Sequence, residues 1–135
     1  MAYDYDDQNV FARILRGEIP NRTVMETAHT LAFHDIRPWA PVHVLVIPKG
    51  PYVTYDHFGA EASDAEIADF TRVVAKLCAE LGVAPDGSPD GGPGYRLIAN
   101  SGGHGHQEVP HMHVHILGGR PLGAMLVGGP PPAGG

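Results

Sequence analysis

Three histidines alternate with apolar residues in the stretch 111–117. Successive side chains of a strand point to opposite faces, so His111, His113 and His115 would share one face and the apolar residues the other. Imidazole titrates near neutrality, donates or accepts a proton, and binds metals. The stretch therefore predicts a strand with one face to bury and one face equipped for chemistry.

A metal site is one such chemistry. At about 3.3 Å rise per residue, His111 and His115 start roughly 13 Å apart, whereas zinc ligands hold their nitrogens about 2.1 Å from the ion. One straight strand does not easily give three ligands, although His111 and His113 could chelate as a pair. The candidates for a further ligand are His43, His104 and His106. We expect no metal site.

Transfer of a phosphorus group is a second chemistry. It needs donors for the phosphoryl oxygens, a nucleophile and an acid, and imidazole can serve as each. The glycine-rich residues 102–107 offer backbone N–H groups that can cradle an anion. His113, the middle histidine, is the natural nucleophile, and its attack as a neutral ring would give a phosphohistidine-type intermediate.

Purely structural histidines are the third interpretation, since buried imidazoles are often hydrogen-bonded fillers. Two polar residues are equally ambiguous: Asp35, in a proline-flanked turn, either forms an Asx-turn or accepts from a ribose, and Asn100 ends a strand. The residues expected to pack or face solvent are His29, His34, Trp39 and His57.

The elements that must position these residues predict an α+β domain. Apolar residues at helical spacing predict a short helix over 9–16, stopped at Gly17. A capping box at Ser63 and Glu66 starts the main helix, which ends at Gly82. The expected strands are 23–26 and 31–34 as a hairpin, a central 43–47, then 95–100 and 111–117. Together they form a five-stranded antiparallel sheet with two helices.

Composition bounds the class of protein. With 135 residues and 43% hydrophobic content, the chain predicts one domain over 1–127 and a flexible Gly/Pro-rich tail over 128–135. A lone Cys78, an acidic start and the lack of a long apolar run indicate a cytoplasmic protein with no membrane partner. A net charge of -6 without a basic cluster excludes a backbone-tracking nucleic-acid binder.

Residues 107–120 resemble the signature of the histidine triad superfamily, His-x-His-x-His followed by apolar residues. The segments similar to its Hint branch, the histidine triad nucleotide-binding proteins, are 33–36, 41–49 and 94–100. The ending 120–123 resembles that of bacterial Hint proteins. The resemblance implies a HIT-like fold whose sheet extends across a homodimer. It also implies hydrolysis of purine nucleoside phosphoramidates without a cofactor. The alternatives are a dinucleoside polyphosphate hydrolase and a nucleotide-binding regulatory module with vestigial hydrolysis.

By position, the resemblance implies that His113 forms a nucleotidyl-histidine intermediate, releasing a nucleoside 5′-monophosphate. His115 would hold the phosphate, and His111 and His43 would complete an imidazole relay that orients and protonates.

The nucleotide-binding residues follow in the same way. The backbone around Gln107 and Val109 would hold the phosphate, Asn100 would lie near it, and Asp35 would accept the ribose hydroxyls. The residues implied for the base pocket are Val10, Phe11, Phe33, His34, Ile36 and Leu45. His106 stands where the branch usually has glycine.

Overall fold

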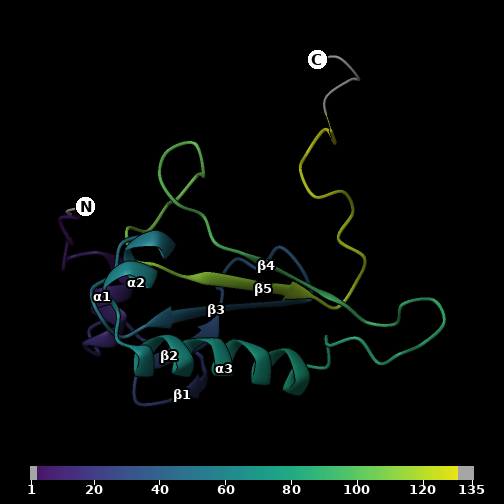
Figure 1. Cartoon of the computed structure of the whole chain (residues 1–135), viewed down its shortest axis with the longest axis horizontal. Coiled ribbons are helices and arrows are strands. Elements are labelled where there is room, and N and C mark those ends of the chain that lie inside the picture. Colours follow the sequence, from purple (N-terminus) through teal and green to yellow (C-terminus); the bar gives the residue numbers. More distant parts are fainter. Residues whose placement is uncertain (1–2, 131–135) are drawn as a thin grey trace.

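The computed structural model describes residues 3–130 (Figure 1). Its strands are β1 (Thr23–Glu26), β2 (Thr30–His34), β3 (Val42–Pro48), β4 (Tyr95–Ile98) and β5 (Val114–Gly118). They form one antiparallel sheet in the order β1-β2-β3-β5-β4. The helices are α1 (Val10–Leu15), α2 (Tyr55–Glu61) and α3 (Asp64–Glu80). The predicted α+β fold with five antiparallel strands is confirmed, and β3 is central as expected.

The structure has three helices where the sequence predicted two. The additional helix, α2, is seven residues long and buries only His57 and Phe58. Two adjacent buried positions make no 3.6-residue stripe, which is why the periodicity missed it. Its start is nevertheless encoded, because the Thr54 hydroxyl caps it by accepting the His57 N–H.

The two predicted helices begin and end for visible reasons. The Asn9 side chain caps α1 by accepting the N–H groups of Phe11 and Ala12. The chain then leaves α1 through Gly17, whose φ of 80° suits glycine. At α3 the predicted capping box is confirmed, with Ser63 and Glu66 bonded reciprocally.

Alternation along the strands divides the core in two. Val44 and Val46 face α3 and belong to the larger cluster, while Leu45 and Ile47 face α1 and belong to the smaller one. Each such side chain stabilises the fold by about 1.5–3 kcal/mol when fully buried. The remaining members of the smaller cluster are Phe11, Leu31 and Phe33. This smaller core forms the floor on which the histidines lie.

The histidine strand is shorter than predicted. β5 begins at Val114, and its ladder with β3 ends at the Val46–Val114 pair. Pro48, which ends β3, has no N–H to continue the ladder. The alternation nevertheless persists outside the regular strand, because Met112 still packs into the larger core with Val114. β4 is likewise shorter than predicted and ends at Ile98.

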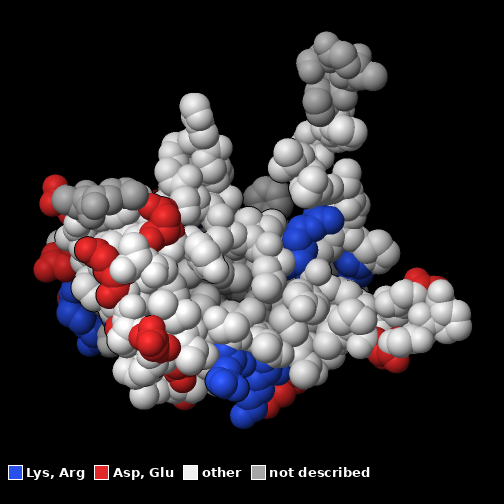
Figure 2. All heavy atoms as spheres, viewed as in Figure 1, with Lys and Arg blue, Asp and Glu red and all other residues white. Residues whose placement is uncertain are grey.

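The surface agrees with the charge argument. On the face shown in Figure 2 the blue basic side chains form small separate patches, and red acidic side chains gather over the end that carries α1 and α2. No helix among residues 3–130 is long and apolar enough to cross a bilayer. The expected tail over 128–135 lies largely outside the described residues, which stop at 130.

Candidate active site

One ring nitrogen of His113 is hydrogen-bonded, and the other has no partner within the described residues. Its Nδ1 donates to the backbone carbonyl of His111 at 2.7 Å. A carbonyl can only accept, so the proton is on Nδ1 and Nε2 carries the lone pair. No buried side-chain nitrogen or oxygen within the described residues lacks a partner, so this unbonded Nε2 has to reach an accessible surface. Phe11 packs edge-on against the ring, with centroids 5.0 Å apart.

His115 presents the opposite group. The backbone N–H of Trp39 donates to His43 Nδ1 at 3.0 Å, which places the His43 proton on Nε2. That Nε2–H donates to His115 Nδ1 at 2.9 Å. Nε2 of His115 therefore carries a proton and is free to donate. The rings of His113 and His115 lie 5.0 Å apart, so a lone pair and a donor stand side by side.

His111 is closed off. Its ring is fully buried, with Nε2 donating to the Pro48 carbonyl at 2.8 Å and Nδ1 bonded to the Tyr5 hydroxyl at 2.6 Å. Both ring nitrogens are used, and neither bonds another imidazole. The only ring-to-ring bond in the described residues is the one between His43 and His115. His111 acts on His113 through its backbone carbonyl.

Burial keeps this cluster neutral. Burial lowers the pKa of His111 to about 4, and burial followed by the neighbouring His113 and His43 lowers the pKa of His115 to about 4. Burial also lowers the pKa of His113, opposed by its bond to the His111 carbonyl. For His43 burial lowers the pKa and Asp35 opposes it. The titration near neutrality expected from the sequence is thus displaced to lower pH.

One set of side chains has the spacing of a metal site. Ligand atoms of Asp35, His43 and His115 lie within 4.8 Å of one another. A metal on His43 Nε2 would need the ring proton on Nδ1, where the Trp39 N–H already points. Two N–H groups cannot face each other there, so the tautomer that the backbone imposes does not fit a metal ligand.

Asp35 does the first of the two things proposed for it. Its Oδ1 accepts the Arg37 N–H at 2.7 Å in an Asx-turn, and its Oδ2 lies 3.5 Å from His43 Nε2. The carboxylate is partly exposed beside the bonded pair His43 and His115.

The loop before the histidines is braced by two of the predicted residues. Asn100 Nδ2 donates to the Gly105 carbonyl at 2.7 Å, and Gln107 Nε2 donates to the carbonyls of Val53 and Val109. The Gln107 backbone N–H is also used, by the Gly102 carbonyl. Gln107 therefore shapes the loop and does not offer a free donor. The Val109 N–H has no acceptor within residues 3–130.

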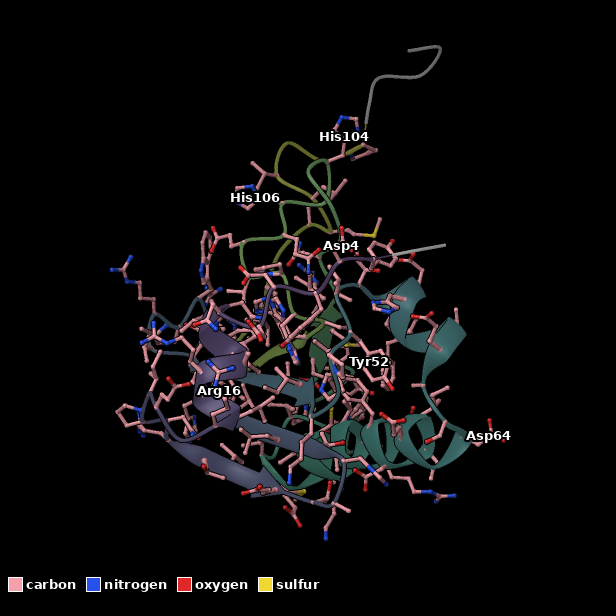
Figure 3. All side chains as sticks on the ribbon, turned by 90° about the vertical axis from the view of Figure 1, so that its left-hand side faces the viewer. Asp4, Arg16, Tyr52, Asp64, His104 and His106 are labelled. Atoms are coloured by element: carbon pink, nitrogen blue, oxygen red, sulfur yellow. The ribbon has the colours of Figure 1, made fainter. Side chains whose placement is uncertain are left out.

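The two loop histidines point away from the cluster. Figure 3 shows His104 and His106 at the tip of this loop, away from the sheet. His106 is 86% exposed, lies 3.3 Å from Glu108, and has a φ of 60°. That left-handed backbone is the kind glycine adopts freely, in line with the glycine usual at this position. Neither residue joins His111 or His113 as the third metal ligand considered above.

The residues implied for the base pocket divide by exposure. Phe11, Phe33 and Leu45 are buried together in the smaller core. Val10 is 40% exposed and Ile36 is 90% exposed. His34 is half-buried at the end of β2. Three of the implied residues thus belong to the core, and two present apolar surface to solvent.

Three groups that shape the site were not found from the sequence. The Trp39 N–H and the Pro48 carbonyl are backbone groups, which carry no residue-type signal. Tyr5 carries such a signal, but it is 106 positions from His111, and only the fold brings the two together.

The sequence is similar to that of known proteins. Residues 16–122 match the HIT domain family. A 13.2 kDa HIT-like protein of Azospirillum brasilense is 54% identical over 129 residues, which are 96% of this chain and 100% of that protein. The purine nucleoside phosphoramidase of Escherichia coli K12 is 42% identical over 120 residues, 89% of this chain and 94% of that enzyme.

Solved structures show the same arrangement of elements. The histidine triad nucleotide-binding protein of Candida albicans gives a TM-score of 0.72 at 34% identity, covering 86% of this chain and 82% of that one. A HIT family hydrolase of Legionella pneumophila gives 0.68 at 38% identity, covering 84% and 95%.

Proposed function

We propose that this chain, which belongs to the HIT domain family, hydrolyses purine nucleoside phosphoramidates through a nucleotidyl intermediate on His113. The observation that carries the proposal is the pairing of an unprotonated, accessible Nε2 on His113 with a donor Nε2–H on His115. The 42% identity to the phosphoramidase of Escherichia coli supports the choice of substrate class.

The reaction uses each nitrogen in the state that its partner imposes. The His113 lone pair attacks phosphorus, the phosphorus–nitrogen bond of the substrate breaks, and the departing nitrogen takes a proton from solvent water and leaves as an amine. His115 Nε2–H and the Val109 N–H stabilise the charge on the phosphoryl oxygens. Water then attacks phosphorus and loses a proton to solvent, and the bond from phosphorus to His113 Nε2 breaks. This releases the nucleoside 5′-monophosphate and restores the lone pair on His113.

For the rest of the nucleotide the proposal follows the positions that the resemblance implies. The ribose hydroxyls lie at Asp35, and the base covers Phe11, Phe33 and Leu45 with Val10, His34 and Ile36 at its edges. Asn100 and Gln107 hold the loop that approaches the phosphate, and His43 holds His115 in its donor tautomer. No step requires a cofactor.

The active form that we propose is a homodimer joined at β4. β4 is the outer strand beside β5, so one of its edges offers unpaired backbone groups. Its Tyr95 and Leu97 are 43% and 46% exposed on the sheet face that carries α3. Pairing two such edges would bury both side chains. Analytical ultracentrifugation should give a dimer for the wild type and a monomer for Leu97→Asp, and a monomeric wild type would refute this assembly.

The substrate is tested by direct comparison. Purified protein should release AMP from adenosine 5′-phosphoramidate far faster than it cleaves a dinucleoside polyphosphate at equal concentration. Faster cleavage of the polyphosphate would replace the proposed substrate. Tight AMP binding with no turnover of either compound would favour a nucleotide-binding regulatory module.

A further inference from the structure

Residues 3–9 form an N-terminal arm whose two tyrosines contact different elements. The Tyr3 hydroxyl donates to Asp56 Oδ2 of α2 at 2.6 Å, and its ring stacks on His57 with centroids 4.8 Å apart. The Tyr5 hydroxyl reaches His111 Nδ1 at 2.6 Å. The arm can be followed in Figure 1 beside the end that carries α1 and α2, and in Figure 3 by the label of Asp4.

The direction of the Tyr5 bond is fixed by the other side of the imidazole. His111 Nε2 must donate, because its partner is the Pro48 carbonyl, so Nδ1 accepts. Burial raises the pKa of Tyr5, so its hydroxyl keeps its proton at neutral pH and donates. His111 is fully buried, which leaves Tyr5 as the donor on that nitrogen.

His111 is in turn the residue that orients His113. Its carbonyl accepts the His113 Nδ1–H at 2.7 Å, and this bond decides that Nε2 is the nitrogen with the lone pair. The His111 ring is held at two points, Tyr5 and Pro48, and β5 does not begin until Val114. The backbone here is also bonded, since the His111 N–H donates to the Val109 carbonyl and the Met112 N–H to the Tyr52 carbonyl, each at 2.8 Å. The ring bonds add a constraint on the His111 side chain that no sheet ladder supplies.

We propose that Tyr5 is a positioning residue for the nucleophile: its hydroxyl holds His111 in place, and so aims the Nε2 lone pair of His113. The role in turnover rests on the proposed function above. Removing the hydroxyl leaves a buried acceptor without a partner. His111 and its carbonyl then shift to regain one, and the attack geometry is lost while the nucleotide-binding residues are unchanged.

The test compares Tyr5→Phe with Tyr3→Phe in the full chain. Both variants remove one hydroxyl from the same arm, but Tyr3 bonds α2 and touches no triad histidine. For Tyr5→Phe we expect kcat to fall about tenfold with KM changed less than about twofold, because misorientation acts on the reacting geometry. Tyr3→Phe should keep the wild-type kcat. Equal losses in both variants, or wild-type kcat in Tyr5→Phe, would overturn the assignment.

A second readout does not depend on any substrate. In spectra of ¹⁵N-histidine-labelled protein, Tyr5→Phe should shift the ring nitrogens of both His111 and His113, and Tyr3→Phe should shift neither. A shift at His111 alone would mean that Tyr5 does not position His113. If the wild type cleaves no phosphoramidate, the proposed function fails, and these spectra still decide whether Tyr5 sets the orientation of the nucleophile.

Discussion

The two ends of the histidine run differ in what their nitrogens contact. At one end, His111 is bonded by Tyr5 and Pro48 on both ring nitrogens. At the other, His113 and His115 each keep one nitrogen free, one without a proton and one with it. The residue type is the same and the spacing is regular, so the chemistry of each ring is set by its partners.

The difference teaches how a short neutral cluster can hold both a nucleophile and a donor. Burial alone would make all the rings neutral but would leave their tautomers undecided. Here three backbone groups decide them: the Trp39 N–H, the Pro48 carbonyl and the His111 carbonyl. In our proposal the open end, His113 and His115, performs the chemistry, and the closed end, His111, keeps it aligned.

Removing the free lone pair should have the largest effect. We expect His113→Ala to lower kcat for adenosine 5′-phosphoramidate by at least about 1,000-fold, as loss of a nucleophile does in other enzymes. Steady-state assays give the value, and a melting curve verifies that the variant is folded. Activity equal to the wild type would place the nucleophile elsewhere.

Removing the free donor should cost less. His115→Ala is expected to lower kcat about 100-fold, the typical effect of losing one donor to a charged transition state. His104→Ala, on the exposed loop, is the matched control and should leave kcat unchanged. A similar loss of kcat in both variants would mean that the Nε2–H of His115 has no particular role in the reaction.

The buried His111 imidazole should make the free energy of unfolding depend on pH. Because burial lowers the pKa of His111 to about 4, the unfolded chain binds this proton at higher pH than the folded one. Above about pH 6.5 His111 is neutral in both states, so it should not change the free energy of unfolding with pH. Between about pH 6.5 and pH 4 its protonation in the unfolded chain should lower the free energy of unfolding by about 3 kcal/mol.

His111→Gln removes that titration and keeps a side-chain N–H for Pro48. Urea unfolding at pH 7 and pH 4 should show a smaller decline with acid for this variant than for the wild type. An equal decline would show that the His111 proton is not linked to folding.

Removing metal ions should not change kcat. The Trp39 N–H keeps the His43 proton on Nε2, so neither a chelator nor added zinc should raise or lower kcat at neutral pH. Activity that is lost to the chelator and restored by zinc would show that His43 takes the other tautomer.

Much of the fold was predictable because its signals are local. The capping box at Ser63 and the unbroken apolar run of β3 gave the right elements, and the alternation of 111–117 placed the apolar residues in the core. The short α2 escaped because two buried residues make no period. The β3–β5 ladder ends early because Pro48 lies opposite the histidine run. That pairing depends on the register of the two strands, which the sequence does not show.

The sequence named the residues of the candidate site but not their hydrogen-bond partners. The alternation of the run put three histidines on one face, and the resemblance added His43, with His113 as nucleophile and His115 at the phosphate. The rings of His111 and His115 differ in their hydrogen bonds because of Tyr5 and of backbone groups, which only the folded chain brings close. Gln107 similarly was expected at the phosphate, and its donors are spent on the loop.

The most direct test is to trap the intermediate. The wild type is mixed with excess adenosine 5′-phosphoramidate, quenched within one turnover under alkaline conditions that spare phosphohistidine, and digested for mass spectrometry. We predict an AMP moiety on His113, attached through Nε2. Modification of His111 or His115 instead, or turnover without any nucleotidyl-histidine, would contradict the division between an open and a closed end.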